Sequence, residues 1–389
     1  MKSFSIVTLL LVTALSCSSD PGEKHNTEPT SSIKHGIVYY QENKYGGWPA
    51  NNGIWIWDNE ILVGFVEADY KPADGLHTYN QSSAHHKYAR STDGGETWTI
   101  EDAYEQGQTA WGNDHSIAAD KAETPVALKT PVEDFTDPGF IITFVRHNNN
   151  NGPTHFYYSM NKGGVWSGPY SFPDLGTAGI ANRTDYIVES DQELSVFLTT
   201  AKTNKKEGRV AFAKTTDGGI NWEFVSWITD EQEGFDIMPS SLRLSDTELI
   251  TIIRTRTAER QDLLTAYRSS DNGKSWARLK NPVNDTGNGG SPPALVKLQD
   301  GRLALAYIYR SVYGSRVNVR FSSDNGESWS DEVVLRSGDG ANRDAGYPRM
   351  VQRPDGKLVL IYYWNNANDE DSTPYRYIAS TIFDPGKWK

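Results

Sequence analysis

Short apolar runs separated by polar turns follow one another along the chain after about residue 33. In each unit a polar hairpin joins two apolar runs, and a third run comes after them. Such runs between Gly, Asn and Asp turns are typical of β-strands in hairpins. The pattern predicts six consecutive units of antiparallel strands. The first pair of runs in each unit begins near residues 53, 115, 183, 241, 293 and 350.

The third run of a unit leads into a polar segment that ends in tryptophan. This segment reads Ser-Ser-Asp-Asn-Gly-Lys-Ser-Trp at residues 269–276, recurs at 91–98, 216–222 and 323–329, and has a degenerate copy at 159–166. Its Asp can accept backbone N–H groups and its Gly can supply a positive φ, which is the chemistry of a hairpin turn. The tryptophans recur about every 55 residues, a period that suits one four-stranded sheet per repeat.

These segments resemble the Asp-boxes (BNR repeats, Ser/Thr-x-Asp-x-Gly-x-x-Trp) of sialidase-like β-propellers. The resemblance implies an all-β propeller of six blades, with seven blades as the alternative. The sixth unit ends at residues 377–383 without a fourth strand. Residues 36–41, which precede the first pair of runs, can supply that strand and close the ring, so that no sheet edge stays exposed.

The N-terminal segment predicts export and anchoring. Residues 1–17 contain one basic residue, a short apolar run and small residues before Cys17, which indicates a signal peptide. The end of this segment resembles a bacterial lipobox, which implies lipidation of Cys17; an ordinary signal peptide with an unmodified cysteine is the alternative. We expect residues 18–32 to be a flexible tether and residues 33–389 to form one catalytic propeller domain. The protein is then a lipid-anchored component of the bacterial cell envelope, at the cell surface or the periplasmic face.

The net charge and the cysteine count exclude several kinds of partner and site. The net charge of −12 over 389 residues argues against a nucleic-acid partner. Cys17 is the only cysteine, which excludes an internal disulfide and a thiolate metal site. We expect a monomer that needs no cofactor, although a structural metal ion is possible.

The topology of a propeller blade predicts which face carries the function. The boxes occupy turns between strands 3 and 4, so the site is expected on the opposite face, where strand 1 begins and strand 2 ends. Histidine clusters there in the first two units, and such clustering favours acid or base chemistry, although any one histidine is more often a packing or solvent residue. These histidines are His77, His85, His86, His115, His147 and His155.

Arginines and aromatic residues occur at equivalent positions of the other units. Arg183 and Arg349 open strand 1 of the third and sixth units, while Arg254 and Arg256 end strand 2 of the fourth. Guanidinium groups bind carboxylates or sulfates in a bidentate manner, although each of these could be an ordinary surface arginine. Aromatic side chains that could stack on sugars, or simply pack the blades, are Trp111, Tyr347 and Trp364.

Two reactions are considered for the site expected on this face. A sialidase needs three arginines, a Tyr/Glu pair and an acidic Asp, but residues 46–54, where its first arginine is expected, contain none. The second reaction is β-elimination on a uronic acid, which needs a neutralised carboxylate, a base and an acid. The clustered histidines, tyrosine and arginines are similar to those of propeller-type ulvan lyases. This resemblance implies a lyase or dehydratase that acts on a uronate-containing, sulfated algal polysaccharide such as ulvan, or on its oligosaccharides.

The resemblance also implies roles for individual residues. His115 and His147 match the catalytic histidine pair, Arg183 neutralises the substrate carboxylate, and Tyr347 is a candidate assistant. No tyrosine opens the fourth unit, which leaves the proton donor and the leaving group, sugar or water, undecided. The expected substrate-binding residues are His86, Asn113, Arg254, Arg256, Arg349 and Trp364.

Other functions stay open on the sequence alone. A sialidase-like exo-glycosidase or another glycosidase needs two carboxylates, for which Asp69, Asp74, Asp114 and Asp236 are eligible. A non-catalytic carbohydrate-binding propeller needs aromatic and hydrogen-bonding groups but no acid and base. Metal binding by residues such as His85, His86 and His115 is disfavoured, because their spacing matches no common ligand motif.

Overall fold

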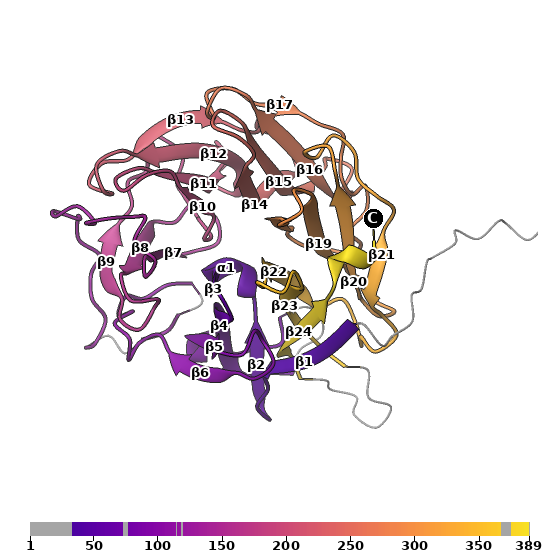
Figure 1. Ribbon diagram of the computed structural model, residues 1–389. Helices are drawn as coiled ribbons and strands as arrows, with labels where there is room; N and C mark the ends of the chain where they lie inside the picture. The colour runs from indigo at the N-terminus through magenta and orange to yellow at the C-terminus, as the bar shows by residue number, and fades with distance from the viewer. Residues whose placement is uncertain (1–32, 73–76, 114, 118–119, 367–374, 389) are drawn as a thin grey trace, which may run out of the picture.

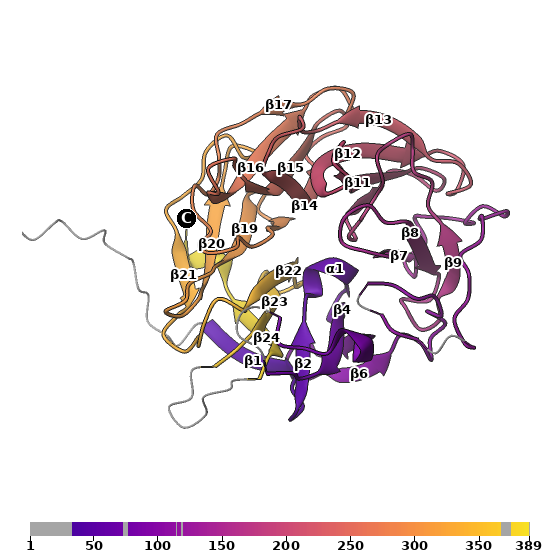
Figure 2. The ribbon, with the colours of Figure 1, turned by 180° about the vertical axis from the view of Figure 1, so that it is seen from behind.

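The computed structural model describes residues 33–72, 77–113, 115–117, 120–366 and 375–388, in which six β-sheets form a ring (Figures 1 and 2). The predicted all-β, six-bladed propeller is therefore confirmed. The predicted signal peptide, Cys17 and the tether lie outside the described residues, as do Asp74 and Asp114. No helix within the described ranges is long and apolar enough to cross a membrane.

The blades follow one another in chain order. Blade 1 contains β2 (Lys44–Gly47), β3 (Ile54–Trp57), β4 (Glu60–Asp69), β5 (His85–Ser91) and β6 (Thr99–Asp102). Blade 2 contains β7 (Ile141–Arg146), β8 (Thr154–Ser159) and β9 (Ser167–Ser171). Blade 3 contains β10 (Tyr186–Val188), β11 (Leu194–Ala201), β12 (Glu207–Thr215) and β13 (Glu223–Trp227).

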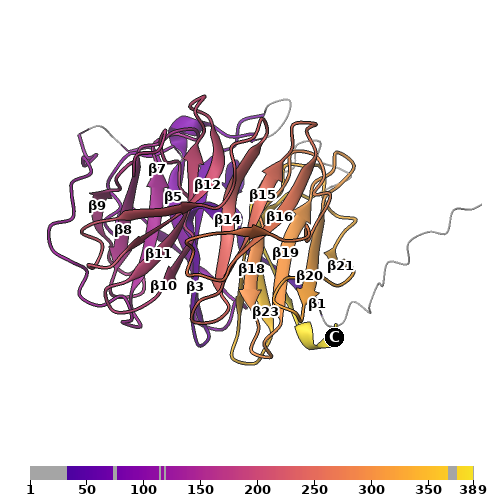
Figure 3. The same cartoon turned by 90° about the horizontal axis from the view of Figure 1, so that it is seen from above.

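The second half of the ring is more regular. Blade 4 contains β14 (Phe235–Arg243), β15 (Leu249–Arg256), β16 (Asp262–Ser269) and β17 (Ala277–Arg278). Blade 5 contains β18 (Ala294–Lys297), β19 (Leu303–Tyr309), β20 (Arg316–Ser322) and β21 (Val333–Arg336). Blade 6 contains β22 (Gly346–Gln352), β23 (Leu358–Trp364), β24 (Tyr377–Phe383) and β1 (Ile33–Tyr39). Figure 3 shows the ring from its side, with the strands roughly upright.

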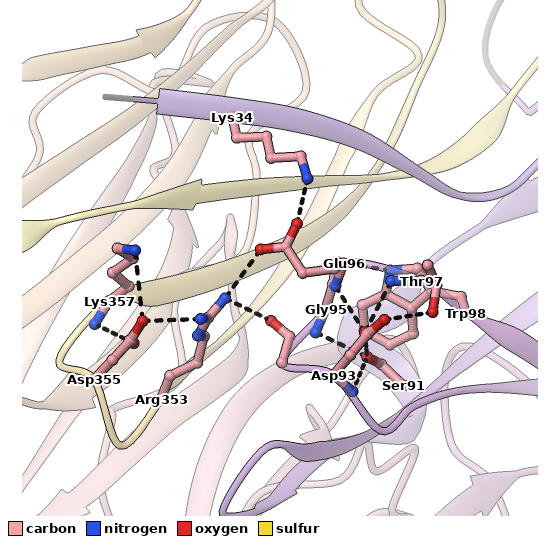
Figure 4. A network of polar contacts seen from close by, with 11 residues as sticks. Lys34, Ser91, Asp93, Gly95, Glu96, Thr97, Trp98, Arg353, Asp355 and Lys357 are labelled. Atoms are coloured by element: carbon pink, nitrogen blue, oxygen red, sulfur yellow. Dashed lines mark hydrogen bonds and ion pairs between the residues drawn. The ribbon is translucent and has the colours of Figure 1, made fainter. Parts of the chain in front are cut away.

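The first strand of the chain closes the ring, as predicted. β1 pairs antiparallel with β24, from Ile33 opposite Phe383 to Tyr39 opposite Ile378. Lys34 of β1 also forms an ion pair with Glu96 of blade 1, and Arg353 of blade 6 donates a hydrogen bond of 3.1 Å to the carbonyl of Gly94 (Figure 4). A strand ladder within blade 6 therefore closes the ring, and an ion pair and a hydrogen bond join blade 6 to blade 1.

The Asp-boxes occupy the turns between strands 3 and 4 of blades 1 to 5. In blade 1, Ser91 Oγ accepts from Gly95 N at 2.8 Å and Asp93 Oδ1 accepts from Thr97 N at 2.9 Å (Figure 4). The box tryptophan packs against the preceding blade: the Trp222 ring lies 4.9 Å from that of Phe172 in blade 2. Each box therefore fixes its own hairpin and joins two blades.

Blade 2 departs from the prediction of a strand near residue 115. His115 forms only an isolated bridge with Gly112, and no named strand of the described ranges precedes β7 in this blade. The inner side of β7 instead contacts the side chain of Thr184, which accepts from Phe144 N at 3.1 Å. The chain reaches the outer side of the blade, where Val126 pairs with Tyr170 of β9. The prediction of a first strand near residue 115 is therefore wrong, because Thr184 contacts the inner side of β7, where that strand would pair.

A short helix, α1 (Pro49–Asn52), lies on the inner side of the ring (Figure 1). Arg349 of β22 donates to the carbonyl oxygens of Ala50, at 2.6 Å, and Thr184. This one side chain thus links α1, blade 3 and blade 6 across the centre of the ring.

Candidate functional site

A polar pocket of about 240 Å³, hereafter the central pocket, lies where strands 1 begin and strands 2 end. Arg146 ends β7, Arg254 lies near the end of β15, and Tyr347 is the second residue of β22. The Asp-boxes occupy the opposite ends of the strands, so the pocket lies on the face expected to carry the function. It is lined by Trp48, Asn51, His77, Tyr79, Arg146, Asn149, Arg183, Glu207, Phe235, Ile237, Arg254 and Tyr347.

Tyr347 combines backbone strain with a shifted pKa in the central pocket. Its backbone has a φ of 54°, a left-handed conformation that is strained for a bulky residue. Arg254 Nη1 donates to its hydroxyl at 3.3 Å, and the guanidinium of Arg310 lies 5.5 Å from its ring centre. Burial alone would raise the pKa of Tyr347, but the charges of Arg254, Arg310 and Arg183 outweigh it and lower the pKa. The phenol is therefore more acidic than an ordinary tyrosine.

The arginines around Tyr347 are held in place by other groups. Arg254 Nη2 donates to the carbonyl oxygen of Gly289. Arg183 Nη1 donates to Glu207 Oε2 at 2.5 Å and to the Ala181 carbonyl at 2.9 Å. Because these arginines are already oriented, they could bind an anion with little further loss of side-chain entropy.

A hydrogen-bonded network connects Arg310 to the histidine of the central pocket. Arg310 Nη2 donates to the Tyr363 hydroxyl at 2.7 Å, and this hydroxyl donates to Asp344 Oδ1 at 3.0 Å. His77 Nδ1 lies 3.5 Å from Asp344 Oδ1, and the backbone N–H of His77 donates to Asp344 Oδ2 at 3.0 Å. Burial raises the pKa of Asp344, but His77, Arg376 and Arg310 together lower it far more. Asp344 is thus a fixed negative charge that accepts from the His77 backbone and lies beside the His77 ring.

The two histidines expected to be catalytic lie outside the lining of the central pocket. His115 is fully buried, and its ring centre lies 4.7 Å from that of His86 and 5.1 Å from that of His85. Burial, followed by the charge of His85, lowers the pKa of His86 to about 3, so His86 is neutral at ordinary pH. His147 is exposed, and its ring packs 4.3 Å from that of Trp111.

Some of the expected substrate-binding residues line the central pocket and others lie outside it. Arg254 lines the central pocket, whereas Arg256 is paired with Asp262 at 2.8 Å outside it. Asn113 donates its backbone N–H to the Arg146 carbonyl at 2.9 Å. Trp364 is 0% exposed and covered by the Arg336 guanidinium, so it has no free face for a sugar. The tryptophan is instead part of the core between blades 5 and 6.

Sequence reasoning missed several residues of this site. Arg146 and Arg310 follow the same rule as Arg254, because each stands at the end of a second strand. The repeat pattern does not distinguish His77 from the other histidines of the face, and Glu207 lies at the start of β12. A comparison of strand ends in all six units would have found the two arginines. No local signal distinguishes Glu207.

Of the carboxylates eligible for glycosidase chemistry, the two that the structure describes, Asp69 and Asp236, do not line the central pocket. Asp69 is paired with Lys44 at 2.8 Å on the surface. Asp236 is buried beneath Thr255 Oγ1, which donates to it at 2.6 Å, and burial raises the pKa of Asp236 to about 6. Among the described residues no group of three His, Cys, Asp or Glu side chains is arranged to hold a metal ion.

A ring of Asp-box blades around an arginine-rich pocket defines a β-propeller of the BNR-repeat type. The family model for the BNR repeat-like domain matches residues 100–360, more than half of the chain, so this chain belongs to that family. A comparison with curated proteins finds no match.

Solved structures with the same fold are distant in sequence. A protein of unknown function from Dyadobacter fermentans DSM 18053 is 20% identical, with a TM-score of 0.67 over 91% of this chain and 99% of that one. A mutant of Trypanosoma rangeli sialidase displaying trans-sialidase activity is 13% identical, with a TM-score of 0.54 over 90% of this chain and 58% of that one. A PL25 ulvan lyase is 10% identical, with a TM-score of 0.47 over 85% and 94%. The first two similarities show a shared fold and do not specify a reaction.

Proposed function

We propose that the protein is a carbohydrate-active enzyme that cleaves or dehydrates a uronate-containing acidic saccharide by β-elimination, with Tyr347 as the base. The observation that carries this proposal is the Tyr347 phenol, which accepts a hydrogen bond from Arg254 and has a lowered pKa in a pocket that also contains Arg183 and Arg146. A phenol of this kind can be ionised at a pH where a free tyrosine is not.

The reaction needs three groups that the central pocket can supply. Arg183 and Arg254 would bind the carboxylate of the uronic acid, which makes its C5 proton more acidic. The Tyr347 phenolate would take that proton, the electron pair of the C5–H bond would form the C4–C5 double bond, and the C4–O bond would break. The departing oxygen would receive a proton from His77, whose ring lies beside Asp344. The leaving group is then a sugar hydroxyl or water.

This assignment changes the roles expected from the sequence. Arg183 keeps the predicted role of neutralising the substrate carboxylate. Tyr347, which was expected to assist, becomes the base. The proposal gives no catalytic role to His115 or His147, because one is buried beside His86 and the other packs at a tilt against Trp111 outside the central pocket.

Hydrolysis with Tyr347 as a nucleophile is the second candidate, and the same lowered pKa favours it. Sialidases are the known case of a tyrosine nucleophile. However, Glu207 is the only carboxylate among the described residues that line the central pocket, and Arg183 holds it at 2.5 Å. A pair of carboxylates as used by most glycosidases is therefore missing from that lining.

Product analysis tests the proposal. The purified protein is incubated with ulvan oligosaccharides, and the products are measured by mass spectrometry and by the near-ultraviolet absorbance of a C4–C5 double bond. β-Elimination gives an absorbing product, with no added water in the summed product masses. Products that together gain one water without absorbance would instead establish hydrolysis. Tyr347→Phe should abolish either reaction, whereas Tyr313→Phe, at a residue that is 96% exposed, should not.

A further inference from the structure

Two larger cavities lie beside the central pocket along blades 4 and 5. One, of about 660 Å³, lies between the ends of β15 and β19 on the same face as the central pocket. The other, of about 710 Å³, continues down the side of blade 5. The two cavities share Asn284, Asp285 and Tyr309 in their linings, so they form one continuous side groove.

Residues 289–290 lie between Arg254 of the central pocket and Asp262 of the side groove. Gly289 accepts a hydrogen bond from Arg254, which lines the central pocket, and donates its N–H to Asp262 Oδ2 at 3.0 Å, a carboxylate that lines the side groove. A saccharide bound at Arg254 could therefore extend over this segment into the groove.

The groove exists because the outer part of blade 4 is short. Its fourth strand, β17, has 2 residues, whereas β13 has 5 and β21 has 4. The side of blade 5 that faces blade 4 consequently stays open beyond β17. Tyr309 and Arg316 line the opening there, with the guanidinium of Arg316 4.6 Å from the ring centre of Tyr309.

The lining of the side groove suits an acidic saccharide. Positive groups exceed negative ones, since six basic and four acidic side chains line the two cavities of a protein whose net charge is −12. Arg260, Lys280 and Arg343 have no carboxylate within ion-pair distance in the described part of the chain. The basic residues are Arg256, Arg260, Lys280, Arg316, Arg320 and Arg343.

Buried donors without partners also line the groove. Nε of Arg316, Nε of Arg320 and Nε1 of Trp329 are buried and make no hydrogen bond within the described residues. Buried donors are usually satisfied by protein, water or ligand oxygen. The hydroxyl, carboxylate and sulfate oxygens of a saccharide are acceptors of the required kind, and partly exposed Tyr309 offers a ring against which a sugar can pack.

We infer that the side groove binds further sugar units of the chain that reacts in the central pocket, so that the substrate is an oligomeric or polymeric acidic saccharide. This inference rests on the proposed function for the reacting end of the chain. The groove itself is defined independently of the reaction, because none of its lining residues lines the central pocket.

The dependence of the rate on chain length tests the inference. The ratio of kcat/KM for ulvan octasaccharides to that for tetrasaccharides is measured for the wild type, Tyr309→Ala, the double variant Arg260→Ala/Arg343→Ala, and Tyr40→Ala. Tyr40 is 51% exposed and lies outside the groove, which makes it the matched control. We expect a wild-type ratio of about ten, because remote binding energy is used in the transition state. The groove variants should bring the ratio close to one, while Tyr40→Ala keeps it.

Direct binding separates failure of the groove from failure of the reaction. Affinity electrophoresis in gels containing ulvan measures binding without turnover, so it applies even if no uronate substrate reacts. If retardation is lost in Tyr309→Ala and in the double variant but kept in Tyr40→Ala, the side groove binds the saccharide, whether or not any substrate reacts. Equal retardation of all variants, or a wild-type ratio near one, would overturn the inference while leaving the proposed reaction intact.

Discussion

At the scale of single residues, the balance of burial and charge at Tyr347 decides what the central pocket can do. Burial favours the neutral phenol, and the nearby guanidinium groups of Arg254, Arg310 and Arg183 favour the phenolate. The charges outweigh burial, so the pKa of Tyr347 is lowered. At Tyr45 the balance is the opposite: burial, with Asp344 and Tyr363, outweighs the charge of Arg376 and raises the pKa strongly.

Replacing Arg254 by alanine should move the pH dependence of the reaction. The base acts as a phenolate, so kcat/KM falls as the pH falls through the pKa of Tyr347. Arg254→Ala removes a positive charge and a hydrogen bond from the phenol, which raises that pKa. The acidic limb of the profile should move to higher pH by about one unit or more. Arg278→Ala, at an exposed residue of β17, is the control. An unmoved limb in Arg254→Ala would exclude Tyr347 as the titrating base.

The central pocket contains three predicted residues whose placement depends only on strand ends. Arg183, Arg254 and Tyr347 were chosen because they stand where strands begin or end on one face, and the ring brings such positions together. His115 and His147 were chosen on the assumption of a regular second blade. That blade is irregular, so their positions relative to the pocket could not follow from the repeat. The network from Arg310 through Tyr363 to Asp344 joins loops and strands whose contacts no local pattern reveals.

At the scale of elements, the Asp-box is a local structure, which is why the sequence predicted it well. In blade 4, Asp271 Oδ1 accepts from Ser275 N at 2.9 Å and Oδ2 accepts from the Ser275 hydroxyl at 2.6 Å. The degenerate box of blade 2 keeps one of these bonds with an amide, since Asn161 Oδ1 accepts from Val165 N at 2.9 Å. The turn therefore needs an acceptor at this position more than it needs a charge.

Asp271→Ala should lower the free energy of unfolding by about 1 kcal/mol, because it leaves these turn donors without their partner. Asp271→Asn should cost less than half as much. Hydrogen bonds to Ser275 lower the pKa of Asp271 to about 2 from 3.8, so the ionic contribution is complete above pH 3.8 and is lost as the pH falls through 2. Urea unfolding of the three proteins at neutral pH measures the difference. Equal losses in both variants would show that the charge is what stabilises the turn.

At the scale of the whole molecule, closure joins the two ends of the chain in one sheet. β1 supplies the outer strand of blade 6, and Tyr39 donates to Glu67 of blade 1 at 2.5 Å. The spacing of the tryptophans and the missing strand of the sixth unit predicted this closure, because both are properties of the repeat. Residues 103–140 contain no box, so the repeat does not predict that the chain passes along the outside of blade 2.

Deleting residues 33–39 together with the preceding segment should open the ring. The edge of β24 would then be unpaired, and the contacts of Lys34 and Tyr39 with blade 1 would be lost. We expect Tm to fall by about 10 °C or more, with association through the free edge. A protein that starts at residue 33 is the control and should keep its Tm. Calorimetry and sedimentation measure both effects, and a monomer of unchanged Tm after the longer deletion would contradict this account of closure.

The most direct measurement of the account as a whole is the initial rate of double-bond formation from ulvan oligosaccharides, compared between Tyr347→Phe and His147→Ala. If the reaction occurs in the central pocket, Tyr347→Phe should lower kcat by about a thousandfold or more, since it removes the base. His147→Ala should change it only a few-fold, because His147 packs on Trp111 outside that pocket. The reverse result, an active Tyr347→Phe and an inactive His147→Ala, would contradict the assignment and return the chemistry to the histidines of blade 2.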